Sequence, residues 1–224
     1  MQNVRTDFTP SLHGFSFRNR FSGQMLPSFI SKIPGISKIL STSQSYHGLC
    51  GGMCFATYDF FLAKRTVLSV NAVPKSGTPL YCYLYQRQID TYGPCGKFIA
   101  KFAFWTALPD SRVQKLTSNE LEKVITQLDN GQAIILGLVY VSIVDTLAIW
   151  LNHQVLAYSY SGDPKSINIK IYDPELPRRD DVVIEIKRES AGLQCKQKVC
   201  NVNREARVRG FFVIPYVPVE PPII

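Results

Sequence analysis

Histidine is scarce in this chain, with three residues among 224. Cysteine is also sparse, because only six are present and no two of them form a C-x-x-C pair. The histidines lie apart in sequence from Cys82, Cys95, Cys195 and Cys200, so the usual ligand spacing of a zinc site does not occur. We therefore expect neither a bound metal nor a cofactor.

The first residues lack the apolar segment of a secretory signal. Residues 1–25 are largely polar and include Arg5, Arg18 and Arg20. We expect a cytoplasmic, reduced protein, with secretion by a non-classical route left open. In an oxidising compartment Cys195 and Cys200, placed here in a loop or at a hairpin end, could form a disulfide.

Residues 133–151 form a long apolar stretch with Asp145 as its single charge. Its length is close to the roughly 20 residues that cross a bilayer. Because β-branched residues crowd its first half, we interpret it as two core segments joined through Asp145. A membrane-facing patch on a lipid-directed enzyme is the lesser alternative.

Basic charge is spread along the chain rather than concentrated in one run. The formal net charge is +8, and it comes from short, separate clusters of lysine and arginine. A solvated surface explains this best, and long-range attraction of an acidic partner is the alternative. We expect no nucleic-acid partner, because no nucleic-acid-binding motif is present. The oligomeric state is left open.

Length and composition predict one α+β domain. A chain that is 46% hydrophobic at this length can bury a full core. We divide the predicted domain, residues 1–224, into an arm (1–43), a core (44–216) and a Pro-rich tail (217–224). The arm is expected to wrap the core and thereby to bury its aromatic rings, which are Phe8, Phe15, Phe17 and Phe21.

Hydrophobic periodicity predicts several elements of the core. Thr117 and Glu120 form a capping box, which predicts a helix that begins there and ends at Asn130-Gly131. A second helix is predicted over 53–64, and residues 80–90 fit a helix or a strand equally well. Strands are predicted over residues 132–141, 153–160, 167–173, 181–187 and 209–216.

Three short motifs supply the residue types of a thiol-dependent active site. Gln44 precedes Cys50 by six residues at a predicted helix start, Asn152-His153 opens a strand, and Asp173 is followed by proline. A helix N-terminus and an adjacent imidazolium both stabilise a thiolate. His153 would exchange the proton and Asp173 would fix its tautomer. Gln44 would donate its amide to the oxyanion.

Two cysteines compete for the role of nucleophile. Cys50 has Gln44 at the expected offset, and Gly51-Gly52 behind it would let a substrate backbone approach and let the chain turn into the helix. Cys54 is the alternative nucleophile, although a small buried hydrophobic residue is its more ordinary role. At a spacing of four residues the two thiols could also form a redox pair. We favour Cys50.

At these motifs the chain resembles papain-like cysteine peptidases, and most of all the peptidase domain of bacteriocin-processing transporters. Gln44-x5-Cys50-Gly is similar to the start of that domain, and Asn152-His153 and Asp173-Pro174 are similar to its histidine and aspartate segments. The resemblance implies a cysteine-bearing helix packed on an antiparallel sheet that carries the histidine and aspartate. Papain itself differs, because Trp-Ala follows its cysteine and an asparagine completes its site.

We expect a papain-like hydrolase that cleaves a peptide, isopeptide or amide bond through a thioester, with a peptide or protein as substrate. Alternatives are an acyltransferase that uses the same Cys, His and Asp, as in transglutaminase-like folds, and a binding or toxin-like module without turnover. Aspartate-proline is also a common turn opener, and a lone histidine in a strand is often structural. The combination of motifs favours the functional interpretation.

Overall fold

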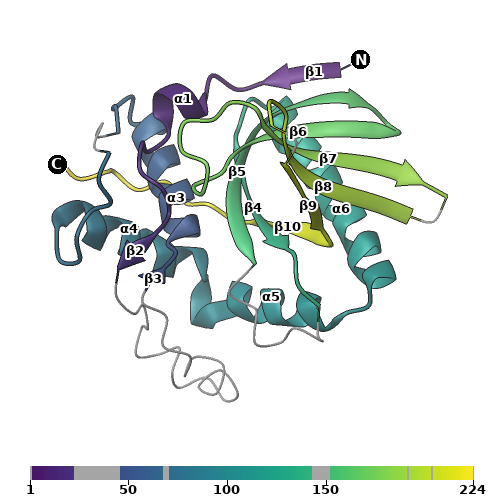
Figure 1. The fold of residues 1–224 in the computed structure, drawn as a ribbon, viewed down its shortest axis with the longest axis horizontal. Helices are drawn as coiled ribbons and strands as arrows, with labels where there is room; N and C mark the ends of the chain where they lie inside the picture. Colours follow the sequence, from purple (N-terminus) through teal and green to yellow (C-terminus); the bar gives the residue numbers. More distant parts are fainter. Residues whose placement is uncertain are drawn as a thin grey trace.

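A curled antiparallel sheet and the helices packed against it form an α+β fold (Figure 1). The computed structural model describes residues 2–22, 46–67, 71–142, 152–190, 192–202 and 204–223. All statements about structure below concern these residues.

The main sheet has the strand order β10-β4-β5-β6-β7-β8-β9, and β1 pairs with β5 beyond the end of β4. Its members are β1 (Gln2–Arg5), β4 (Ile134–Val139), β5 (His153–Asp163), β6 (Ser166–Tyr172), β7 (Val182–Glu189), β8 (Gly192–Val199), β9 (Arg204–Val208) and β10 (Gly210–Ile214). Only Arg209 separates β9 from β10, although these strands stand at opposite ends of the order. The sheet must therefore curl back toward itself.

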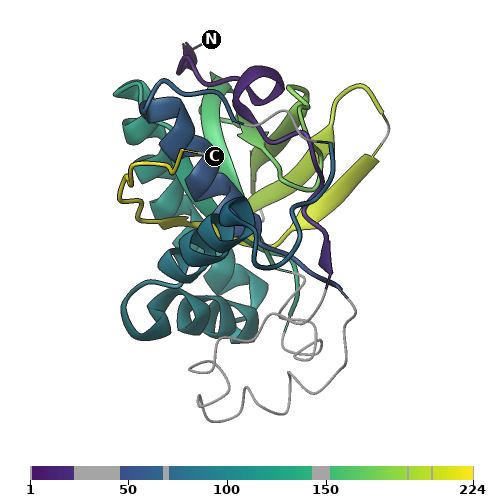
Figure 2. The ribbon, with the colours of Figure 1, turned by 90° about the vertical axis from the view of Figure 1, so that its left-hand side faces the viewer.

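Helices pack against both faces of this sheet. Figure 2 shows the ribbon from the left-hand side of Figure 1, with helices toward the viewer. The helices are α1 (Pro10–His13), α3 (Cys50–Leu62), α4 (Pro79–Thr91), α5 (Lys97–Ala107) and α6 (Asp110–Asp129), with a 3-10 turn, η2 (Pro94–Gly96). Alternate residues of the strands pack in different clusters, one with α6 and one with α3 and α5. A small separate sheet pairs β2 (Phe21–Ser22) with β3 (Tyr46–His47).

Most predicted elements are confirmed, but their ends differ. The five predicted strands correspond to β4, β5, β6, β7 and β10. The helix predicted over 53–64 begins three residues earlier, at Cys50, which places that thiol in the first turn. The ambiguous segment 80–90 is helix α4, which begins at Pro79. The Thr78 hydroxyl caps this helix, because it accepts a hydrogen bond from the Tyr81 N–H.

The capping box at Thr117 is wrong, because α6 already begins at Asp110. Thr117 is buried in the middle of that helix, where its hydroxyl donates to Val113 O at 2.8 Å and accepts from Phe211 N at 3.3 Å. Glu120 accepts from Val213 N at 2.8 Å. These two polar residues therefore join α6 to β10, a use that local sequence does not distinguish from capping.

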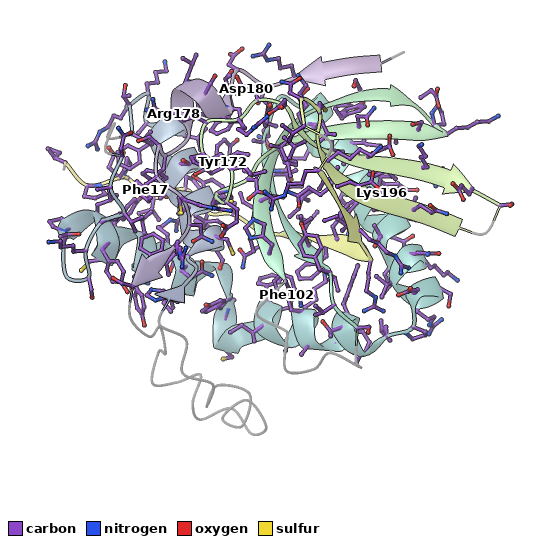
Figure 3. The ribbon with its side chains drawn as sticks, in the orientation of Figure 1. Phe17, Phe102, Tyr172, Arg178, Asp180 and Lys196 are labelled. Atoms are coloured by element: carbon purple, nitrogen blue, oxygen red, sulfur yellow. The ribbon has the colours of Figure 1, made fainter. Side chains whose placement is uncertain are left out.

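The expectation that the arm buries its aromatic rings is confirmed. Phe8, Phe15, Phe17 and Phe21 are at most 1% exposed. Phe8 packs with α3 and the central strands, whereas the other three pack with α3 and α4. Figure 3 shows Phe17 on the helical side of the molecule and Lys196 over the outer strands. Residues 23–43 of the arm lie outside the described residues.

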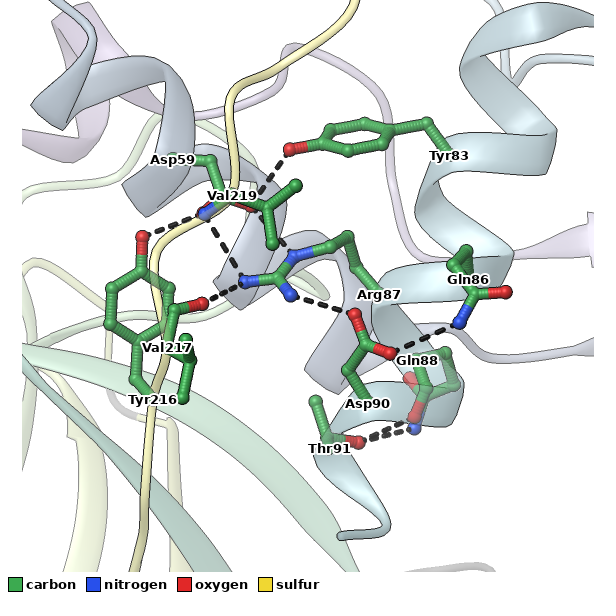
Figure 4. A network of polar contacts seen from close by, with 10 residues as sticks. All are labelled: Asp59, Tyr83, Gln86, Arg87, Gln88, Asp90, Thr91, Tyr216, Val217 and Val219. Carbon is green, nitrogen blue, oxygen red and sulfur yellow. Dashed lines mark hydrogen bonds and ion pairs between the residues drawn. The ribbon is translucent and has the colours of Figure 1, made fainter.

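A buried ion pair fastens the C-terminal tail to the helices (Figure 4). Arg87 of α4 is 2% exposed and donates to both carboxylate oxygens of Asp59 in α3, at 2.7 and 3.2 Å. The Arg87 guanidinium also reaches Val217 O at 2.9 Å, and the Tyr216 hydroxyl donates to Asp59 at 2.7 Å. Three segments distant in sequence therefore meet at one buried charge pair.

Two expectations about the remaining segments need correction or restriction. Cys195 lies inside β8 and is buried, not in a loop, and Cys200 follows the strand; both are free thiols. Of the apolar stretch 133–151, the first part forms β4 as expected, and residues 143–151 lie outside the described part. Among all the residues that the structure describes, no helix has the length and apolar character needed to span a membrane.

Candidate active site

Sheet pairing brings the predicted histidine and aspartate together. His153 is the first residue of β5, and Asp173 directly follows the last residue of β6. β5 and β6 are antiparallel neighbours, with Leu156 opposite Tyr172, so the start of one strand lies beside the end of the other. As a result His153 Nε2 donates to Asp173 Oδ1 at 2.7 Å.

Cys50 approaches the same histidine from helix α3. It is the first residue of the helix, and its side chain lies close enough to His153 to raise the pKa of the imidazole. Because Nε2 of the ring is bonded to Asp173, Nδ1 is the ring nitrogen that remains for proton exchange with the thiol. The first turn of α3 carries no acidic residue, so its backbone N–H dipoles act on the thiol without an opposing carboxylate.

Electrostatics in this group favour a protonated histidine. Burial alone would lower the pKa of His153, but the Asp173 carboxylate and the adjacent Cys50 outweigh it and raise the pKa well above the ordinary imidazole value. Burial alone would likewise raise the pKa of Asp173, yet His153 and further hydrogen bonds hold it below the usual carboxyl range. An imidazolium beside an ionised aspartate is the expected state at neutral pH.

Asp173 is held by two further donors that the sequence motifs did not reveal. Gln197 Nε2 in β8 donates to Asp173 Oδ2 at 2.6 Å, and the backbone N–H of Glu175 donates to Oδ1 at 2.8 Å. The Tyr140 hydroxyl in turn donates to Gln197 Oε1. Gln197 comes from a strand two places away in the sheet, and no local pattern marks it.

Cys54 is placed differently from Cys50. It is fully buried, and its thiol donates to Gln154 O at 3.5 Å. Burial raises its pKa well above the ordinary thiol value, and the charges of Cys50 and Asp173 add to this effect. The geometry therefore favours Cys50 over Cys54 as nucleophile. Both thiols are free, and a redox pairing between them stays a prediction.

The two glycines after Cys50 do not form an open approach for substrate, contrary to expectation. Both are buried within helix α3. A Cβ at Gly51 would lie 2.1 Å from Gln154 Oε1, and one at Gly52 would lie 2.1 Å from Leu84 O of α4. The glycines therefore allow close packing of α3 against α4 and against the residue after His153.

Two further residues near Cys50 in sequence are Gln44, the predicted oxyanion donor, and the histidine at position 47. Gln44 is not among the described residues, so its role as oxyanion donor stays a prediction. His47, in β3, contacts the Tyr81 hydroxyl at 3.2 Å and stacks on Phe21. Within the described ranges, no cluster of histidine, cysteine, aspartate or glutamate could hold a metal ion.

Asn152, the neighbour of His153, connects the residue after β4 to the end of helix α5. Its Oδ1 accepts from Tyr140 N at 3.0 Å, and its Nδ2 donates to the Thr106 hydroxyl at 3.2 Å. These bonds fix the chain immediately before the histidine. The candidate active site, defined here as Cys50, His153 and Asp173, thus lies where α3 meets the adjacent ends of β5 and β6.

Comparison of the chain with protein-family models, with curated proteins and with solved structures gave no match.

Proposed function

We propose that the protein is a papain-like cysteine hydrolase that cleaves a peptide, isopeptide or amide bond. The observation that carries this proposal is the hydrogen bond of His153 to the Asp173 carboxylate at 2.7 Å, together with a Cys50 side chain close enough to raise the pKa of the same imidazole. Cysteine, histidine and carboxylate joined in series are the arrangement that nucleophilic acyl transfer requires. The α+β fold, with the cysteine at a helix N-terminus, is compatible with it.

In the proposed reaction the Cys50 thiolate attacks the substrate carbonyl carbon and forms a tetrahedral oxyanion. The Cys50 backbone N–H and Gln44 are the proposed donors to that oxygen. The protonated His153 then gives its proton to the leaving amine as the carbon–nitrogen bond breaks, which leaves a thioester. Water, deprotonated by His153, attacks the thioester and releases the acid and the thiolate.

The first test measures alkylation of each cysteine by iodoacetamide as a function of pH, with the modified residue mapped by mass spectrometry. Exposed Cys82, Cys95 and Cys200 serve as reference thiols in the same molecule. We expect Cys50 to react faster than these well below about pH 8, and His153→Ala to remove the difference. Labelling of Cys50 no faster than the reference thiols would contradict the proposal.

Product analysis then separates the alternatives. A hydrolase should release only the free acid from a peptide or amide substrate, whereas an acyltransferase should transfer the acyl group to an added amine. A reactive Cys50 without turnover on any acyl substrate would instead favour a binding module.

A further inference from the structure

Asn19 is a buried polar residue of the N-terminal arm, a segment that the sequence motifs leave without a role. It is 6% exposed and bonds through both ends of its side chain and through its backbone. Its Oδ1 accepts from Leu49 N at 2.6 Å, and its Nδ2 donates to Glu175 Oε1 at 2.9 Å. Its own N–H donates to Pro174 O at 3.0 Å.

These three bonds join the two halves of the candidate active site. Leu49 is the N-cap residue of α3 and immediately precedes Cys50. Pro174 and Glu175 immediately follow Asp173, and the Glu175 N–H also donates to the Asp173 carboxylate. A single side chain therefore spans from the helix that carries the thiol to the turn that carries the acid.

The contacts are specific for an amide side chain. Asparagine offers an acceptor for Leu49 N and a donor for Glu175 on one rigid group, which neither aspartate nor alanine supplies. The Asn19 amide also packs closely against the backbone of Gly48, because a Cβ at Gly48 would lie 2.8 Å from Asn19 Nδ2. Leu49 N lies at the helix start, where N–H groups lack partners within the helix.

We propose that Asn19 is a positioning residue that sets the distance between the Cys50 thiol and the His153–Asp173 pair. This inference rests on the proposed function. A shift of about 1 Å between reacting groups can lower a rate by on the order of 10²-fold, so the register of α3 against the turn matters for thiolate formation and attack.

Arg18, the residue immediately before Asn19, provides a matched control. Its Nε donates to Glu175 Oε2 at 3.3 Å, but its side chain is 55% exposed, and within the described residues no hydrogen bond or ion pair joins it to α3. Exposed ion pairs contribute little to stability. Arg18→Ala thus perturbs the same carboxylate without breaking the connection between helix and turn.

The experiment compares wild type with Asn19→Ala, Asn19→Asp, Arg18→Ala and the double variant Asn19→Asp/Glu175→Gln. The readouts are the pH profile of Cys50 alkylation relative to Cys82 and Cys200, and the thermal unfolding midpoint. We expect Asn19→Ala and Asn19→Asp to slow Cys50 alkylation at neutral pH by roughly tenfold or more, and Arg18→Ala to leave it unchanged. The double variant exchanges donor and acceptor and should restore most of the wild-type rate.

The outcomes separate this inference from the proposed function. If wild type shows fast, His153-dependent alkylation and Asn19→Ala retains the same pH profile, the role of Asn19 is overturned and the proposed function stands. If Cys50 alkylation in the Asn19→Asp/Glu175→Gln variant is as slow as in Asn19→Asp, the role of Asn19 is also overturned. Restoring a donor–acceptor pair between positions 19 and 175 would then have no effect on the thiol. If wild-type Cys50 reacts no faster than the reference thiols, the proposed function fails, and this inference fails with it.

Discussion

Asp173 is a carboxylate that is 3% exposed and still has a lowered pKa. Burial by itself opposes ionisation, so the surrounding donors must outweigh it. His153, Gln197 and the backbone of Glu175 together supply three N–H groups to its two oxygens. The charge on the histidine is thus maintained by a carboxylate whose own ionisation depends on neighbours from other strands.

Gln197→Leu should weaken this arrangement. Oδ2 of Asp173 would lose its donor in a buried setting, which costs about 1–3 kcal/mol of unfolding free energy. The pKa of Asp173 should rise, so His153 should be less strongly protonated and Cys50 alkylation slower. Urea unfolding and the alkylation profile measure the two effects.

Gln194→Leu is the matched control on the same strand. Gln194 donates to Glu189 in an exposed contact and does not touch the candidate site. Similar losses in both variants would mean that strand β8, and not the bond to Asp173, is what the substitution disturbs.

At the scale of elements, buried polar groups hold helices and strands in register. Glycines 51 and 52 let α3 approach α4 and β5, and Thr117 and Glu120 connect α6 to β10. The Asp59–Arg87 pair adds the C-terminal tail to the contact between α3 and α4. Burying such a pair is costly unless further hydrogen bonds satisfy it, and here two tyrosine hydroxyls and a backbone N–H do so.

Arg87→Leu should destabilise the protein by about 3–5 kcal/mol, because it leaves the buried Asp59 carboxylate without its cation. The double variant Asp59→Asn/Arg87→Leu should cost less than Arg87→Leu alone, since no unpaired charge remains. Urea unfolding of the single and double variants measures the coupling. A double variant that is less stable than Arg87→Leu would contradict this account.

Arg65→Leu tests how much stability the attachment of the C-terminal tail contributes by itself, apart from the Asp59–Arg87 pair. Arg65 donates to Pro221 O and Pro222 O at the end of the same tail but has no bond to Asp59. We expect its replacement to cost less than Arg87→Leu and to release the tail to proteolysis.

At the scale of the whole molecule, residues 2–22 of the arm are part of the folded core. β1 extends the main sheet beside β5, and four phenylalanines of the arm lie in the hydrophobic clusters. Removing such rings from a core costs about 3–5 kcal/mol each. Residues 2–22 therefore support the fold, and together with Asn19 they support the candidate site.

The stability of the folded protein should depend on pH through His153 and Asp173. A raised histidine pKa contributes stability that is complete below the unfolded value of about 6.5 and is lost as pH rises through the folded pKa. A lowered Asp173 pKa contributes stability above about pH 4 that is lost as pH falls through its folded pKa. Wild type should thus lose stability relative to His153→Ala as the pH rises above about 6.5 and through the raised pKa of the folded state.

Urea unfolding across that range measures the difference. His13→Gln, which replaces a histidine outside the candidate site, should retain the decline seen in wild type. A constant difference between wild type and His153→Ala would mean that the ion pair with Asp173 does not stabilise the fold.

Sequence alone determined the features that depend on local periodicity and chain order. It predicted strands β4, β5, β6, β7 and β10 but not β8 and β9, and it predicted helix α3, the burial of the arm phenylalanines, and Cys50, His153 and Asp173 as a group. Strand alternation and helix stripes arise from neighbouring residues, so they can be recognised without long-range contacts. Tertiary structure decided which residues meet: it brought Gln197 and Asn19 to the site, buried the two glycines against α4 and β5, and placed Thr117 inside a helix. Those contacts depend on strand order and on the curl of the sheet, which no short stretch of sequence specifies.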